Sequence, residues 1–169
     1  MKVEESELNG RLERFRDTCR KAGVKLTQQR LEIFREVAST LDHPDAEEVY
    51  RGVRDRVPTV SLDTVYRTLW MLHDLGLVST LGPRGGSMRF DANGNPHHHY
   101  VCVLCGLVRD FESPALSDLE IPRGVGAFGS VLAARVEVRG LCRKCAKTRS
   151  AGRGSESLIR PASPIRDSR

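Results

Sequence analysis

Two Cys-x-x-Cys pairs, Cys102 with Cys105 and Cys142 with Cys145, are the strongest chemical signal in the sequence. A tight knuckle of this kind brings both thiolates to one side, so each pair can bind the same metal ion. Two knuckles together supply the four sulfur ligands of a closed tetrahedral site, the usual form of structural zinc. Two disulfides and an iron–sulfur cluster are the alternatives. The fifth cysteine, Cys19, fits a small core residue on a helix.

Three consecutive histidines lie just before the first knuckle. In an extended strand, side chains alternate between two faces, so His97 and His99 point one way and His98 the other. Asp91 lies six residues before His97, and Asp110 lies on the strand that follows the knuckle. Two imidazoles on one face with carboxylates nearby indicate a second metal site. A solvated histidine cluster at a strand end is the alternative.

Apolar residues at helical spacing predict four helices in the first half of the chain. The first covers residues 5–22, and the others start after Thr27, at Pro44 or Asp45, and at Ser61 or Asp63, the last running to residue 76. Two short strands, 77–81 and 88–91, follow around a hairpin loop. This order predicts a winged helix-turn-helix domain whose fourth helix is the recognition helix. His43 taken alone fits a turn residue.

The second half has a different composition. Residues 92–96 form a hinge-like linker, strands are expected over 100–103 and 107–111, and a short helix over 114–119. Leu132, Val136 and Val138 fit a last pair of strands. We expect an α+β protein with a winged-helix domain over 1–91, a hinge over 92–96, a small α/β zinc-stabilised dimerisation domain over 97–148, and a disordered basic tail over 149–169.

Charge and composition narrow the class of protein. The 169 residues carry a net charge of +5, which favours an anionic partner such as nucleic acid. The N-terminus is dense in charge and has no apolar signal region, and no apolar run is long enough to span a membrane. We therefore expect a cytoplasmic protein whose thiols stay reduced.

Several segments in this order resemble the ferric uptake regulator (Fur) family. They are Gly23–Arg30, His43–Tyr50, Ser61–Leu69, Arg89–Asp91 and His97–Gly106. The resemblance implies a metal-dependent, homodimeric transcription repressor that binds a palindromic operator in double-stranded DNA. It also implies that the protein is not an enzyme, although a metallohydrolase and an RNA-binding zinc ribbon are alternatives. The segment 113–130 departs from the family, because Pro122 and several glycines interrupt its usual longer helix.

The resemblance also assigns residues to a regulatory metal. Fe²⁺ or Mn²⁺ is held by the positions that match His43, Asp91, His97, His99 and Asp110. Aspartate at both carboxylate positions is typical of the peroxide-sensing branch, PerR, in which the oxidised ligands match His43 and His97. An iron- or manganese-responsive uptake regulator without peroxide sensing is the alternative. Three imidazoles and two carboxylates suit Fe²⁺ or Mn²⁺ better than a thiolate cage would.

The family pattern finally places DNA contacts on the first domain. Tyr66 and Arg67 are expected to reach bases from the recognition helix, and Lys25 is expected near the minor groove. Arg84 on the wing hairpin is placed to meet phosphates. Partial burial of Tyr66 in the core is the alternative for that residue.

Overall fold

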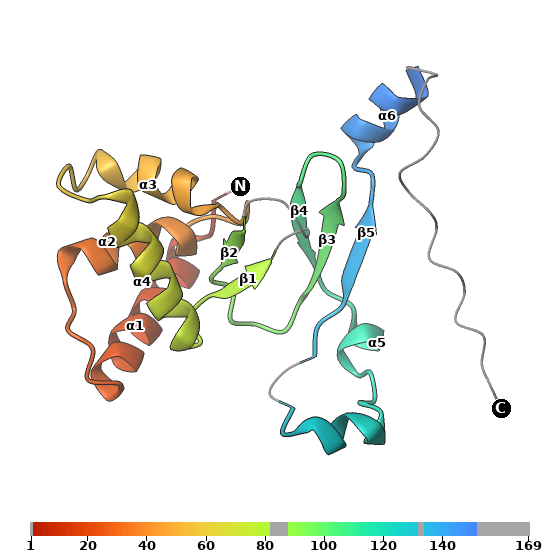
Figure 1. Ribbon diagram of the computed structural model, residues 1–169, viewed down its shortest axis with the longest axis horizontal. Helices are drawn as coiled ribbons and strands as arrows, with labels where there is room; N and C mark the ends of the chain where they lie inside the picture. Colours follow the sequence, from red (N-terminus) through yellow and green to blue (C-terminus); the bar gives the residue numbers. More distant parts are fainter. Residues whose placement is uncertain (1, 82–87, 132–133, 152–169) are drawn as a thin grey trace.

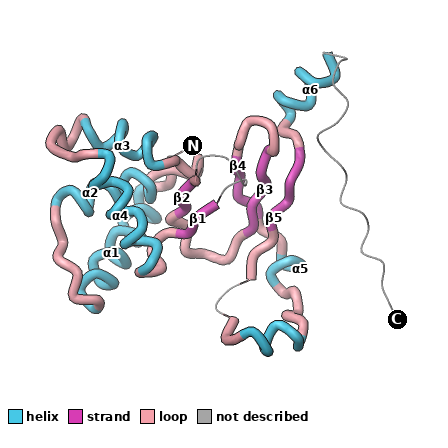
Figure 2. The backbone as a smooth tube through the Cα atoms, viewed as in Figure 1, coloured by secondary structure: helices cyan, strands magenta, loops and turns pink. Residues whose placement is uncertain are grey.

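The computed structural model describes residues 2–81, 88–131 and 134–151, and its helices and strands fall into two units (Figure 1). Helices α1–α4 lie together on one side, a three-stranded sheet lies on the other, and a small β-hairpin lies between them (Figure 2). Across these described residues, no helix is long and apolar enough to cross a membrane. The predicted α+β class is confirmed.

The helical unit contains α1 (Glu5–Lys21), α2 (Gln28–Ala38), α3 (Ala46–Arg54) and α4 (Leu62–Asp74). Side-chain caps start the last three helices. The oxygens of Thr27 and Ser61 accept the backbone N–H three residues on, and Asp45 forms a reciprocal capping box with Glu48. The predicted helix starts are confirmed.

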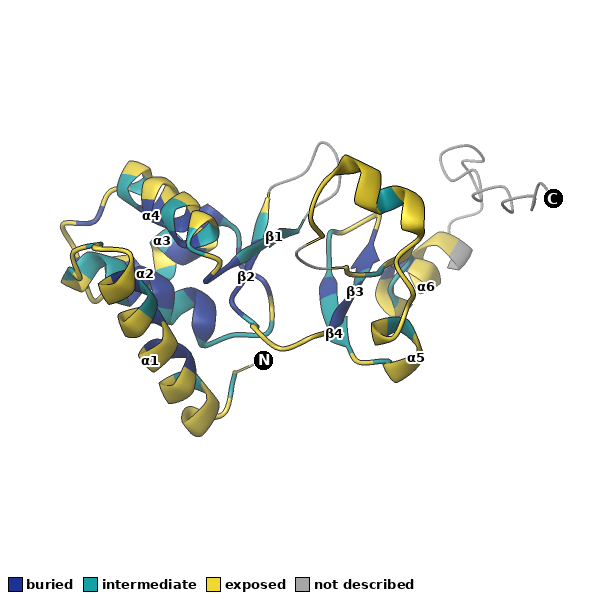
Figure 3. Ribbon diagram, turned by 90° about the horizontal axis from the view of Figure 1, so that it is seen from below, coloured by how far each residue is buried: buried dark blue, intermediate teal, exposed yellow. Residues whose placement is uncertain are grey.

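The core of this unit gathers the apolar faces of all four helices. Phe15 of α1 stacks on Phe34 of α2 with ring centroids 4.8 Å apart. Cys19 is buried in the same core, as predicted. The faces turned inward are buried and those turned outward are exposed (Figure 3). This packing leaves Tyr66 and Trp70 of α4 exposed.

The wing is an antiparallel hairpin of β1 (Ser79–Leu81) and β2 (Arg89–Asp91), shorter than predicted. Phe90 of β2 and Ala92, the residue that follows β2, are buried in the helical core. The end of the hairpin that carries Asp91 is therefore fixed to the helices. The predicted Arg84 lies outside the described residues.

The second unit is a sheet of β3 (His98–Cys102), β4 (Val108–Phe111) and β5 (Glu137–Gly140), in the order β4-β3-β5. Strand β3 pairs antiparallel with β4 and parallel with β5. It begins two residues earlier than predicted, so it includes His98 and His99, and His97 directly precedes it. The expected last strand pair is wrong: one strand, β5, forms beside β3, Val136 precedes it, and Leu132 lies outside the described residues.

Three short helices complete the second unit. They are α5 (Pro114–Ser117), the 3₁₀ helix η1 (Arg123–Phe128) and α6 (Arg143–Ala151). The interruption expected between residues 113 and 130 is present, because α5 and η1 are separate and largely exposed (Figure 3). The boundary predicted for a disordered tail is wrong, because α6 continues through residues 149–151. The rest of that segment lies outside the described residues.

Candidate metal centres

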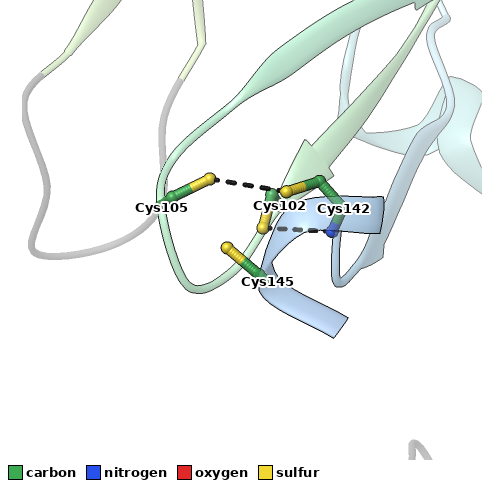
Figure 4. Close-up of side chains that lie close together, drawn as sticks. All are labelled: Cys102, Cys105, Cys142 and Cys145. Carbon is green, nitrogen blue, oxygen red and sulfur yellow. Dashed lines mark hydrogen bonds between the residues drawn. The ribbon is translucent and has the colours of Figure 1, made fainter. Parts of the chain in front are cut away.

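The four cysteines of the two knuckles meet where β3 ends and α6 begins (Figure 4). Their sulfur atoms all lie within 4.8 Å of one another, and Cys105 Sγ lies 3.8 Å from Cys142 Sγ. A tetrahedral zinc with bonds of about 2.3 Å places its sulfurs about 3.8 Å apart. All the cysteines within the described residues are free of disulfides. The spacing of the sulfur atoms therefore fits a zinc ion.

The pKa values of these thiols also fit a site that binds a cation. Burial raises the pKa of Cys102, but hydrogen bonds from the backbone N–H groups of Cys142, Cys105 and Leu104 outweigh burial and lower that pKa to about 6. The nearby Cys142 and Cys105 side chains raise the pKa of Cys145 to about 12. Four thiolates this close repel one another, so the fully deprotonated set needs a positive ion at its centre.

A second cluster lies between the helical unit and the sheet. His97 Nε2 lies 2.8 Å from His99 Nε2 and 3.0 Å from Asp91 Oδ2. Asp110 Oδ1 lies 2.8 Å from His43 Nε2 and 3.5 Å from His99 Nε2. His99 belongs to two groups of possible ligands, one with His43 and Asp110 and one with Asp91 and His97. All five residues of the predicted regulatory site are therefore brought together.

Strand geometry explains how three of these residues, His97, His99 and Asp110, meet. The antiparallel register places His99 directly opposite Asp110, and alternation sends His98 to the other face. There His98 Nδ1 accepts a hydrogen bond from the Val136 N–H, and its ring is buried. The prediction that His97 and His99 share one face is confirmed.

His43 reaches the cluster from a tight turn before α3. Its φ of 51° lies in the left-handed region, which is uncommon for a residue other than glycine. The turn is held by β2, because Arg89 Nη1 donates to the His43 carbonyl at 2.9 Å and the Phe90 N–H donates to the Pro44 carbonyl at 3.0 Å. His43 is thus a turn residue, as its sequence context indicates, and it also faces the cluster. Backbone strain of this kind is concentrated at functional sites.

The charge state of the cluster fits a divalent cation. Burial would raise the pKa of Asp91, but hydrogen bonds with His97 and His99 outweigh it and hold this pKa well below its usual range. Burial disfavours the charged form of Asp110, but the hydrogen bond and the charge of His43 favour it. The pKa of Asp110 is therefore also lowered. Three imidazole Nε2 atoms surround the buried Asp110 Oδ1, that of His43 at 2.8 Å, that of His99 at 3.5 Å and that of His97 at 3.9 Å. An oxygen in this setting is suited to a metal ion.

Two asparagines of the hinge support the cluster, and nothing in the sequence pattern indicated them. The Asn93 N–H donates to Asp91 Oδ1 at 2.7 Å, and Asn93 Nδ2 donates to Asp110 Oδ2 at 3.4 Å. His97 Nδ1 lies 2.7 Å from the Asn95 carbonyl, which fixes the proton on Nδ1 and leaves Nε2 to act as a ligand. Asparagine in a short, turn-like linker is common in proteins, so its presence in this sequence did not specifically predict a role at a metal site.

Three of the predicted DNA-contacting residues, Lys25, Tyr66 and Arg67, are exposed on the helical unit. A groove of about 510 Å³ runs between the start of α2 and α4, and Lys25 and Arg67 line it. Arg67 Nε pairs with Asp63 Oδ2 at 3.0 Å, and both side chains are largely exposed. Tyr66 is 44% exposed, so the alternative of core burial is wrong for this residue.

A sequence model described as the ferric uptake regulator family matches residues 21–123. This chain belongs to the ferric uptake regulator family. Among curated relatives, the peroxide-responsive repressor PerR of Staphylococcus epidermidis is 36% identical over 146 residues, covering 86% of this chain and 97% of the relative. The resemblance stated from the sequence is confirmed.

Solved structures of Fur proteins have the same fold. The Helicobacter pylori ferric uptake regulator has a TM-score of 0.66 at 24% identity, over 93% of this chain and 99% of that one. A Pseudomonas aeruginosa ferric uptake regulator with manganese has a TM-score of 0.63 at 31% identity, over 76% and 97%. This Fur-family chain is accordingly a metal-responsive transcription regulator and not an enzyme, and the family regulates transcription as DNA-binding homodimers.

Proposed function

We propose that this protein is a cytoplasmic repressor that binds a palindromic DNA operator as a homodimer and senses hydrogen peroxide. The winged-helix domain covers residues 1–91, the hinge 92–96, and the dimerisation domain 97–148. Zn²⁺ is held by Cys102, Cys105, Cys142 and Cys145. Support comes from the spacing of the sulfur atoms and from the family of relatives, which includes peroxide-responsive repressors.

The regulatory metal, Fe²⁺ or Mn²⁺, is assigned to His43, Asp91, His97, His99 and Asp110. One observation carries this assignment: His43 comes from the helical unit, and its Nε2 lies 2.8 Å from Asp110 Oδ1 of the sheet. A metal that shares these ligands joins the two units in one relative orientation. In a dimer this orientation sets the distance between the two α4 helices, which must match DNA half-sites about one helical turn apart. Metal binding thus selects the arrangement that can bind DNA.

The sensing step is assigned to the same ligands. The chemistry that Fe²⁺ supplies when bound is the reduction of hydrogen peroxide next to His43 and His97. An imidazole that gains an oxygen atom is a poorer ligand, so the metal-mediated contact between the two units is lost and DNA is released. Asp91 and Asp110 contribute the charged oxygen donors that suit Fe²⁺. Mn²⁺ does not drive this reaction efficiently, so the manganese form represses and resists peroxide.

Exposure of the Fe²⁺ form to peroxide tests the proposal. We expect peptides that contain His43 or His97 to gain the mass of one oxygen atom, and operator binding to fall in parallel. The Mn²⁺ form, treated identically, is the control and should keep both its mass and its DNA affinity. Release of DNA without oxidation of either histidine would contradict the peroxide mechanism.

An iron- or manganese-responsive uptake regulator without peroxide sensing is the second candidate. It is favoured by the similarity to the P. aeruginosa ferric uptake regulator with manganese. It predicts that DNA binding follows the metal concentration and that peroxide leaves the Fe²⁺ form unmodified. The mass measurement therefore separates the two functions.

DNA recognition is assigned to Lys25, Tyr66, Arg67 and Arg84. Replacing Arg67 by Ala should weaken binding to an operator duplex selected from random sequences by about 1–3 kcal/mol and relax the preference for one guanine. The control is Arg20→Ala, which removes a similarly exposed arginine paired with Asp17 on α1. Titrations of both variants check the prediction. An equal loss of affinity for operator and for unrelated duplex would indicate phosphate contact instead.

A further inference from the structure

Arg135 of the second unit contacts the wing of the first unit beside the regulatory cluster. Its Nη1 lies 2.6 Å from Ser79 Oγ, and Ser79 Oγ lies 3.3 Å from Asp91 Oδ2. Neither Ser79 nor Arg135 belongs to the ligand set proposed above. The two hydrogen bonds link an exposed arginine to a buried carboxylate through one hydroxyl group.

The chemistry of the three groups fixes the direction of both hydrogen bonds. A guanidinium can only donate, and an ionised carboxylate can only accept. The Ser79 oxygen therefore accepts from Arg135, and its own O–H donates to Asp91 Oδ2. With the hydroxyl proton committed in this way, Asp91 Oδ2 is kept facing His97 Nε2 at 3.0 Å.

Two strand registers build this arrangement. Ser79 is the cross-strand partner of Asp91 in the wing, so their side chains lie next to each other on one face of the hairpin. In the sheet, β3 and β5 are parallel, with His99 beside Glu137. Extending this register back by two residues brings Arg135 level with His97, and both residues line a cavity of about 280 Å³. Arg135 thus reaches Ser79 from the loop that leads into β5, the strand beside β3.

We propose that Arg135 and Ser79 are positioning residues for the regulatory metal, acting as a directed hydrogen-bond relay that orients Asp91 across the two units. The inference rests on the proposed function, because it assumes that Asp91 is a ligand. Groups that hydrogen-bond to metal ligands typically change metal affinity by 10- to 100-fold when they are removed. The relay also makes part of the contact between the units independent of the metal.

Calorimetric titration of the zinc-loaded chain with Mn²⁺ tests the relay. We expect Ser79→Ala to weaken Mn²⁺ binding by on the order of tenfold, and Arg135→Gln to weaken it by several-fold. Because Arg135 acts through Ser79, the double variant should bind Mn²⁺ as Ser79→Ala alone does. Ser79→Thr keeps the hydroxyl group on a strand residue and should restore most of the affinity.

Arg139→Gln is the matched control, since Arg139 is an exposed arginine of β5 that pairs with Glu137 of the same strand. It should leave Mn²⁺ affinity unchanged. Unchanged zinc content and melting temperature in Ser79→Ala would separate positioning from general loss of structure. Unaltered Mn²⁺ binding in Ser79→Ala, or a further loss on adding Arg135→Gln to it, would overturn the relay alone. A parent chain that binds no Mn²⁺ would overturn the proposed function and the relay with it.

Discussion

Replacing Cys142 by Ser should release the zinc ion and unfold most of the second unit. The reason is the small core of that unit. Among the described residues beyond residue 96, the buried apolar side chains are Val101, Cys102, Val108 and Cys145. A sheet with so little buried apolar surface depends on its metal, and zinc contributes on the order of 10 kcal/mol to the folding of comparable small domains.

Metal analysis and light scattering would measure this effect. We expect the zinc content to fall from about one ion per chain to almost none, and the dimer to dissociate, because the metal supplies the folding energy of the unit. Cys19→Ala is the control: this thiol is buried in the helical core, so the variant should lose some stability and keep its zinc. A Cys142→Ser protein that stays dimeric with a full complement of zinc would contradict the assignment.

Replacing His99 by Ala should abolish regulation by Fe²⁺ or Mn²⁺. His99 is shared by both groups of possible ligands, whereas His43 and His97 each belong to one. Removing the His99 imidazole therefore takes one ligand from each group. It weakens metal binding by His43 and Asp110 and also by Asp91 and His97. We expect the affinity for Mn²⁺ to fall by at least about 100-fold.

The affinity of His99→Ala for operator DNA should fall together with its affinity for Mn²⁺. Coupling between distinct sites is typically worth 1–3 kcal/mol, so operator affinity in Mn²⁺ should fall by about 5- to 150-fold, to the level of the metal-free protein. The control is His73→Ala, which removes a partly exposed histidine of α4 outside the cluster and should leave Mn²⁺ binding unchanged. Fluorescence anisotropy with and without Mn²⁺ measures both variants. Metal-dependent DNA binding that survives in His99→Ala would place the sensor elsewhere.

The sequence alone predicted the features that depend on periodicity. The alternation of side chains along an extended segment was enough to place His97 and His99 on one face, because extended geometry has a period of two. The helix starts followed from capping at Thr27, Asp45 and Ser61, which is a local interaction. The cysteine spacing indicated a common metal site, and the four sulfur atoms do converge.

Features that depend on pairing between distant segments could not be predicted in the same way. Val136 and Val138 alternate like strand residues, but β5 begins at Glu137 because that is where it lies alongside β3. The position of His43 depends on Arg89 and Phe90, which hold its turn from 46 residues further along the chain. No local pattern records such contacts, and the resemblance to the family supplied His43 instead.

The supporting residues were missed for a related reason. Ser79, Asn93 and Arg135 are polar residues in a strand, a hinge and a loop, where such residues are ordinary. Their role follows only from the hydrogen bonds they make to Asp91, Asp110 and each other. Hydrogen-bond partners of this kind have no sequence period, so only a three-dimensional arrangement reveals them.

The parallel pairing of β3 with β5 has a consequence for the newborn chain. β5 and the second cysteine knuckle follow the five assigned regulatory ligands in the sequence, so the ribosome makes them after those ligands. Until Glu137–Gly140 have left the ribosome, β3 is paired on one side only, and Cys102 and Cys105 have no second knuckle. The β4-β3-β5 sheet and the four-cysteine cluster can therefore form only after the segment through Cys145 has been made.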